Sequence, residues 1–359
     1  MDQFSLAALQ KEIGRHYRMA VTEMKPQGPI WKITAPSGSY VLKLMHRSPA
    51  ELQQLTIHLK KLHQNGFQEI VTPVPTIGGD SFFGFAGRNY ILLPFIHGAS
   101  PSFSNRKHQE RVASLYARFH EASFQATASN DVSLLSWVEE YTARIRFLQA
   151  CLHELADSPR LNRIDRAVQR WGNYYLRQAD YALKGLERAC ETRPESAGRG
   201  IAAGFCHNDP APRNIIMQDR KWYLIDFELA GINLFIKELA TLLLRVLSAN
   251  AWQPESVIQL LDSYCKIRPL PDGELEILPF LLCFPQKFWR FCSQRYLEKL
   301  DRGEHFYQEK IWSLVQEEAL RRKALQVWSA DFCNDAEEEY DVRLNQSGPI
   351  DGDVGLAGL

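Results

Sequence analysis

A short β-like segment, residues 203–227, lies within a chain whose second half otherwise carries helical patterns. Its apolar runs, such as Ile215-Ile216-Met217 and Tyr223-Leu224-Ile225, are separated by Asn, Asp, Pro and Arg, which is typical of strands joined by loops. Apolar residues at helical spacing fill the stretches 104–189 and 234–327 on either side. We therefore expect a large helical lobe that contains a small β element with polar loops.

The first hundred residues carry strand and turn signals instead. Strand-like runs at 30–34 and 40–44 flank Pro36-Ser37-Gly38, which predicts a hairpin. Further strands are expected around 70–76 and 89–93. This part of the chain is therefore predicted to form a β-rich lobe.

One helix is expected within that lobe. Ser48-Pro49-Ala50-Glu51 has Ser at an N-cap position, Pro at the first helical position and Glu three residues after the Ser. The helix should run to about Leu62 and end near Asn65-Gly66.

These patterns predict three parts along the chain. Residues 1–95 form the small lobe and residues 96–335 the helical lobe, with a short connector at 93–98. Residues 336–359 contain Glu337-Glu338-Glu339 and little to bury, which predicts a disordered tail. A cleft between two such lobes is the default ligand site.

Composition excludes several classes of protein. The 359 residues hold 42 Lys and Arg against 42 Asp and Glu, so bulk positive charge does not favour nucleic-acid binding. No apolar run reaches the length of a membrane span, and the N-terminus does not resemble a secretion signal. The seven cysteines are scattered without a C-x-x-C pair, which favours a reducing cytoplasmic setting over a disulfide framework or zinc site.

Three polar side chains in the β-like segment form a set suited to phosphoryl transfer. Asp209 and Asn214 are five residues apart, and Asp226 follows twelve residues later. In such chemistry one carboxylate positions the acceptor hydroxyl and takes its proton, while an amide oxygen and a second carboxylate hold Mg²⁺ against the phosphates. Isolated Asp and Asn on loops are more often turn formers, but the three-part spacing favours the functional interpretation.

The pattern H-x-D-x-x-x-x-N followed by I-D-F resembles the catalytic loop and metal-binding strand of protein kinases. It looks still more like the aminoglycoside/choline phosphotransferase branch. The resemblance implies an α+β, protein-kinase-like bilobal fold with ATP and Mg²⁺ as cofactors. It implies Asp209 as catalytic base, Asn214 and Asp226 as magnesium ligands, and His207 as a brace for the loop. The stretch Ile236-Lys237-Glu238-Leu239-Ala240 resembles the family's Asp-Leu-Ala stretch, with Glu238 as a supporting residue.

The same resemblance extends to the small lobe. Val41-Leu42-Lys43 resembles the family's lysine strand, which implies that Lys43 meets the phosphates of ATP. Glu51 is either the helix acid that pairs with this lysine or a residue that only favours the helix N-terminus. Gly28 lies in the turn that would cover the phosphates, and Leu93 and Phe95 lie in the hinge whose backbone would bind adenine.

Softer motifs resemble the CotS-type spore coat proteins. They are Tyr90 to Gly98, Ala117 to Ser123 and Phe284 to Arg290. We therefore expect an ATP- and Mg²⁺-dependent phosphotransferase acting on a small-molecule hydroxyl, without nucleic-acid or membrane partners. The alternative is a coat or scaffold protein, associated with spore coat proteins, that keeps the fold with little or no catalysis.

Overall fold

The structure is a computed structural model, and it describes residues 3–124, 133–192 and 200–328. The chain divides into two compact units, which are described separately. Unit 1 comprises residues 1–132, 201–249 and 256–270, and unit 2 comprises residues 133–200, 250–255 and 271–359. The expected disordered tail at 336–359 lies outside the described residues.

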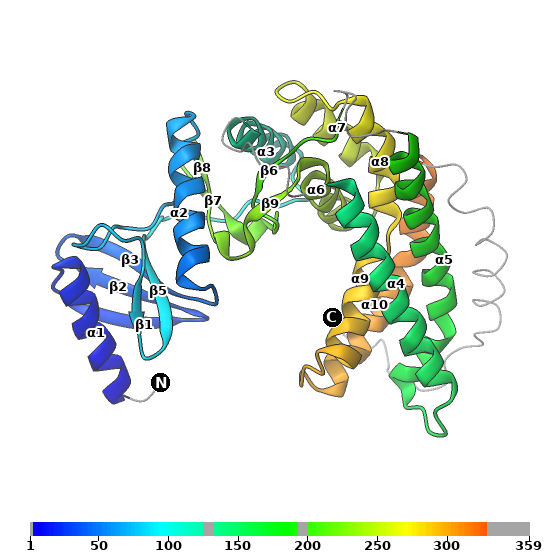
Figure 1. Cartoon of the computed structure of the whole chain (residues 1–359), viewed down its shortest axis with the longest axis horizontal. Helices are drawn as coiled ribbons and strands as arrows, with labels where there is room; N and C mark the ends of the chain where they lie inside the picture. Colours follow the sequence, from blue (N-terminus) through cyan, green and yellow to red (C-terminus); the bar gives the residue numbers. More distant parts are fainter. Residues whose placement is uncertain (1–2, 125–132, 193–199, 329–359) are drawn as a thin grey trace, which may run out of the picture. The chain divides into compact units, whose positions relative to one another are not determined.

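Unit 1 contains a five-stranded antiparallel sheet in the order β1-β2-β3-β5-β4. Its strands are drawn in blue to cyan in Figure 1. Its strands are β1 (Glu23–Gln27), β2 (Ile30–Ala35), β3 (Gly38–Met45), β4 (Phe83–Phe85) and β5 (Arg88–Pro94). The predicted strands at 30–34, 40–44 and 89–93 and the hairpin between the first two are confirmed, with Ala35 opposite Gly38 at the turn. β3 pairs with both β2 and β5, so Lys43 lies on a central strand.

The strand expected around residues 70–76 is wrong. Only Ile70 forms an isolated bridge, to Leu224. Pro73 and Pro75 have no backbone N–H to donate to a neighbouring strand, and this prevents a continuous ladder.

The expectation of a single helix among residues 1–95 is also wrong, because α1 (Gln3–Tyr17) precedes the sheet. Leu9 and Ile13 are fully buried and belong to the same apolar cluster as Ile33, Leu42 and Leu92 of the sheet. The helix has no acidic residue in its first turn to mark its start. Its stability therefore comes from packing on the sheet, not from a local end signal.

The predicted second helix is confirmed as α2 (Pro49–Gln64). Ser48 caps its first turn through a side-chain contact with the Glu51 N–H, and the Glu51 carboxylate accepts from the Ser48 N–H at 2.7 Å. This reciprocal capping box satisfies two helix-end donors and fixes where the helix begins.

The rest of unit 1 combines helices with two small sheets. Its elements are α3 (Arg106–Phe124), β6 (Ala203–Cys206), β7 (Ile215–Gln218), β8 (Lys221–Leu224), β9 (Gly231–Leu234), α6 (Phe235–Ala249) and part of α7 (Pro254–Cys265). β6 pairs with β9, and β7 pairs with β8. Between β5 and α3 the chain passes so close to β7 that a Cβ on Gly98 would lie 2.2 Å from the Met217 carbonyl oxygen. Glycine is therefore required there.

Unit 2 is helical, with α4 (Leu134–Ala156), α5 (Arg163–Thr192), α8 (Asp272–Cys283), α9 (Gln286–Cys292), a π-helical turn (Ser293–Leu297) and α10 (Glu304–Gln326). Aromatic side chains dominate its core, and Phe288 stacks on Tyr175 at 4.2 Å between ring centroids. Glu318 accepts hydrogen bonds from Tyr174 and Gln178 inside this core. Among the helices that the structure describes, none has the length and apolar character of a membrane span.

Candidate active site

The loop after β6 brings Asp209 and Asn214 into direct contact. The Asn214 side-chain nitrogen donates to Asp209 Oδ2 at 2.8 Å and to the Asp209 carbonyl oxygen at 3.0 Å. A short 3₁₀ turn (Pro212–Asn214) sets the five-residue spacing between the two side chains. Because the amide nitrogen is engaged by Asp209, the amide oxygen is the ligand-type atom that Asn214 offers.

His207 joins this loop to the strand that leads to Asp226. The ring is fully buried, its Nε2 lies 2.7 Å from the Ile225 carbonyl oxygen, and its Nδ1 accepts from the Asp209 N–H at 3.3 Å. These contacts require the proton on Nε2, since Nδ1 acts as acceptor. The Ile225 N–H in turn donates to the Asn214 carbonyl at 3.0 Å. Ile225, the residue before Asp226, is therefore held by a backbone contact with Asn214 and by the His207 side chain.

Asp226 and Lys43 form an ion pair at the end of this strand. Lys43 Nζ contacts Asp226 Oδ1 and lies 3.3 Å from Glu228 Oε2. Burial raises the pKa of the Asp226 carboxyl, but the hydrogen bond and the charge of Lys43 outweigh burial and leave this pKa below its ordinary value. β3 therefore places the Lys43 ammonium group beside the Asp226 carboxylate.

Glu228 is a site residue that the sequence analysis missed. Its Oε1 accepts from the His46 N–H at 3.0 Å, while the buried Oε2 forms the ion pair with Lys43 but accepts no hydrogen bond from the described residues. Arg47 holds the same segment by donating to the Glu228 carbonyl oxygen at 2.8 Å. The available signal was an acid two residues after Asp226, on the same short 3₁₀ turn (Phe227–Leu229).

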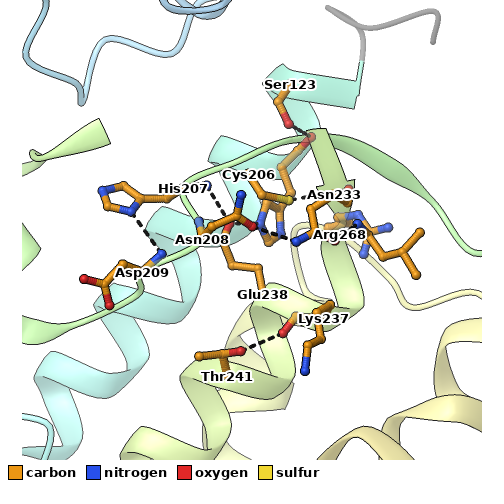
Figure 2. Close-up of polar contacts among 12 residues, drawn as sticks. Ser123, Cys206, His207, Asn208, Asp209, Asn233, Lys237, Glu238, Thr241 and Arg268 are labelled. Carbon is orange, nitrogen blue, oxygen red and sulfur yellow. Dashed lines mark hydrogen bonds and ion pairs between the residues drawn. The ribbon is translucent and has the colours of Figure 1, made fainter. Parts of the chain in front are cut away.

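Glu238, on α6, supports the loop from below (Figure 2). Its Oε1 accepts from the Asn208 N–H at 2.5 Å, and its Oε2 accepts from the His207 N–H at 3.2 Å. His120 Nε2 lies 2.9 Å from the same Oε2, and both side chains are fully buried. The ligand atoms of His120, Cys206 and Glu238 lie within 4.8 Å of one another. Both Glu238 oxygens are already used by these donors, so the cluster acts as a structural support for the loop.

Two residues beside the functional side chains have left-handed backbone. Asn208 has φ of 63° and Asp226 has φ of 65°. Non-glycine residues rarely adopt this conformation, and each carries strain of roughly 1–3 kcal/mol. Asn208 offsets part of it through side-chain contacts with Leu229 and Asn233. The two strained positions lie directly at the two loops that carry the acidic side chains.

Two arginines that the sequence analysis missed occupy the Asp209 carboxylate. Arg213 donates to Oδ2 at 2.7 Å, and Arg245 donates to Oδ1 at 2.6 Å. Burial lowers the pKa of the Arg245 guanidinium, the Asp209 charge raises it, and Arg213 lowers it, with a net shift below the ordinary value. Arg245 follows Glu238 by seven residues, which places both on one face of α6. That spacing was the available signal.

The remaining predicted residues lie at the start of α2 and along the five-stranded sheet. Glu51 is bound to Ser48 in the capping box, and the acidic partners of Lys43 among the described residues are Asp226 and Glu228. Gly28 occupies the β1–β2 turn with φ of 60°. Leu93 pairs with Val41, and the Phe95 N–H donates to the Ser39 carbonyl at 3.0 Å. The structure therefore assigns Glu51 to the helix start and leaves the nucleotide roles of the other three as predictions.

Solved structures share this architecture. An aminoglycoside phosphotransferase from Alicyclobacillus acidocaldarius superposes with a TM-score of 0.75 at 21% identity, covering 88% of this chain and 94% of its own. A spectinomycin phosphotransferase, solved with ADP and spectinomycin, gives a TM-score of 0.63 at 15% identity, covering 89% and 98%. The fold is therefore protein-kinase-like, with an antiparallel N-terminal sheet and a mostly helical C-terminal part, as predicted.

Sequence comparison defines the family. Residues 29–276 match the phosphotransferase enzyme family, and the chain belongs to that family. The spore coat protein S of Bacillus subtilis is 22% identical over 303 residues, covering 82% of each chain. A homoserine kinase of Nitrobacter winogradskyi is 26% identical over 261 residues, covering 68% of this chain and 69% of its own. The predicted recognition is confirmed, and by its family the chain is a phosphotransferase.

Proposed function

We propose that the chain transfers the γ-phosphate of ATP to the hydroxyl of a small molecule, with Mg²⁺ as the metal. The observation that carries this proposal is the unbroken set of contacts from Asp209 through Asn214 and Ile225 to Asp226 and Lys43. Phosphoryl transfer relies mainly on positioning and charge neutralisation, and this network supplies a base, oxygen ligands and a cation in one place. The ADP in the spectinomycin phosphotransferase structure supports a nucleotide as the donor.

The donor set fits a magnesium ion. Asp226 and Asn214 offer carboxylate and amide oxygens, and Glu228 adds a buried carboxylate oxygen that lacks a hydrogen-bond partner among the described residues. Hard oxygen ligands of this kind suit Mg²⁺, which binds through one or two carboxylates and substrate phosphates. When bound, the ion would neutralise charge that develops on the phosphate oxygens.

The side chains divide the reaction between them. Asp209 accepts the proton of the acceptor hydroxyl while the acceptor oxygen forms a bond to the γ-phosphorus and the bond from that phosphorus to ADP breaks. Lys43 pairs with a phosphate oxygen, while Glu238 and His207 keep the loop in place. Gly28, Leu93 and Phe95 would contact the nucleotide through the turn and the hinge.

The substitution Asp209→Asn tests this proposal. It keeps the shape of the side chain but removes the base, so MgATP affinity should stay within a few-fold while turnover falls by ~10²-fold or more. Calorimetry measures the affinity, and a coupled ADP-release assay over a panel of hydroxyl compounds measures turnover. The catalytic role is contradicted if wild type phosphorylates no acceptor and slow ATP hydrolysis is the same in Asp209→Asn.

A coat or scaffold role is the second candidate, and the relationship to spore coat protein S favours it. A scaffold needs the packing of the fold but not the Asp209 carboxylate. Under this alternative, Asp209→Asn keeps its association with spore coat proteins and no acceptor is turned over by wild type. A pull-down with isolated coat proteins, compared between wild type and Asp209→Asn, separates the two candidates.

A further inference from the structure

The two ends of the candidate site carry opposite charge. Counted over the directly paired side chains alone, Lys43 faces two carboxylates, Asp226 and Glu228, at the end that would bind metal and nucleotide. At the end that would bind the acceptor, two guanidinium groups, those of Arg213 and Arg245, face the single carboxylate of Asp209. A positive acceptor end is unsuited to a cationic alcohol and suited to an anionic one.

The Arg245 side chain is more buried than that of Arg213. The Arg245 side chain is 35% exposed, whereas that of Arg213 is 70% exposed. On α6, Glu238 and Arg245 are seven residues apart and lie on one face of the helix. The first binds the loop backbone and the second binds the Asp209 carboxylate. α6 therefore fixes a guanidinium beside the proposed base.

Tyr116 on α3 adds an unused donor in the same place. Its ring is 1% exposed, and its hydroxyl has no hydrogen-bond partner among the described residues. Burial raises the pKa of this hydroxyl and keeps it protonated, and the charges of Glu238, Asp209 and Arg245 act on it as well. A protonated hydroxyl beside a guanidinium is suited to an anionic oxygen.

The Asp209 carboxylate is already bound by three donors. Arg245 holds Oδ1, while Arg213 and Asn214 hold Oδ2. An ionised carboxylate has about four acceptor positions, so Oδ1 keeps one position for an acceptor hydroxyl next to the Arg245 contact. An anionic group on the acceptor would bind the Arg245 guanidinium, which has further N–H donors, and would place the hydroxyl of the same molecule beside Oδ1.

Resting on the proposed function, we infer that the acceptor is a hydroxy acid whose carboxylate is bound by Arg245, with Tyr116 assisting. Arg245 is thus a specificity-determining residue, because it selects alcohols that carry an anion. A cationic alcohol offers Arg245 no anion, so Arg245 would stay paired with Asp209. The positive charge of the alcohol would also repel the Arg245 guanidinium. The relationship to a homoserine kinase, a protein named for a hydroxy acid, agrees with this class.

Matched acceptors test the inference. L-homoserine and other hydroxy acids are compared with their carboxamides, which keep the hydroxyl and the size but lose the negative charge, and choline serves as a cationic alcohol. We expect kcat/KM to be about 10- to 100-fold higher for the acids, the range of a charge-assisted hydrogen bond. Arg245→Gln should remove this preference by raising the KM for the hydroxy acids, while the KM for ATP stays within a few-fold of the wild-type value. Amides or choline turned over as well as the acids would overturn the inference and leave the phosphotransferase intact.

Binding without nucleotide gives a second readout. Calorimetric titration of wild type with each hydroxy acid should show binding that is weakened in Arg245→Gln, only partly restored in Arg245→Lys and reduced in Tyr116→Phe. Circular dichroism checks that each variant is folded. Lack of acid binding to wild type, or equal binding to wild type and Arg245→Gln, overturns the inference. Failure of the proposed function is seen separately, as a lack of MgATP binding and of turnover on every acceptor.

Discussion

At the scale of single residues, the site depends on where individual charges lie. Asp226 and Lys43 neutralise each other in this structure, and Lys43 holds the pKa of the Asp226 carboxyl low despite burial. A carboxylate that stays ionised can bind a metal without first losing a proton. The same pair presents the lysine where nucleotide phosphates would arrive.

Asp226→Ala should abolish the Mg²⁺ dependence of nucleotide binding while the protein stays folded. The side chain is 42% exposed, so its removal leaves no buried cavity. Calorimetric titration of ATP with and without Mg²⁺ measures the effect. Asp219→Ala is a matched control, because Asp219 has φ of 52° and lies exposed between β7 and β8. MgATP binding as tight as wild type would contradict the metal role.

Lys43→Ala should weaken ATP far more than adenosine, because only ATP offers the lysine a charge. Competition titrations with the two ligands measure the ratio of their losses. Lys60→Ala, an exposed lysine on α2, should change neither affinity. Equal weakening of ATP and adenosine would instead assign Lys43 a structural role.

At the scale of elements, the sequence predicted those features that are set by residues close together in the chain. The capping box at Ser48 and Glu51 was readable because both partners lie within four residues. α1 was not readable, because its stability comes from Leu9 and Ile13 packing on strands further along the chain. The Arg245 contact was missed for the same reason, since the partners are 36 residues apart and meet only when α6 lies under the loop.

Ser48→Ala should lower the free energy of unfolding by about 1 kcal/mol, the usual effect of losing an N-cap. ATP affinity should be unchanged, since the structure engages Glu51 in the helix cap. Urea denaturation and ATP titration measure the two quantities. Ser48→Asp, which preserves a cap acceptor, should retain most of the stability. If ATP affinity falls together with stability, Glu51 contributes to nucleotide binding and its assignment to the helix cap alone is wrong.

At the scale of the whole molecule, every contact of the candidate site belongs to unit 1. Residues 43–47, 207–214 and 225–230 are joined by hydrogen bonds within that unit. Unit 2 has its own aromatic core and its own buried network around Glu318. We therefore expect nucleotide binding to stabilise the hydrogen bonds of unit 1 first.

Saturating MgATP should slow amide hydrogen exchange in these three segments and leave the centre of α5 and α10 unchanged. Ligand at about 100 times its Kd stabilises the state that binds it by about 2.7 kcal/mol. Hydrogen exchange read by mass spectrometry locates the protection, and Asp226→Ala with the same nucleotide is the control. Equal protection of α5 and α10 would contradict a site confined to unit 1.

The left-handed backbone at Asp226 has a consequence for how this chain could change over generations. Glycine there would relieve the strain, so a protein selected only for robustness gains by accepting it. The exchange would remove the carboxylate that pairs with Lys43. A relative that serves only as a structural protein could accept this exchange. Glycine at this position would therefore indicate that such a relative has lost catalysis.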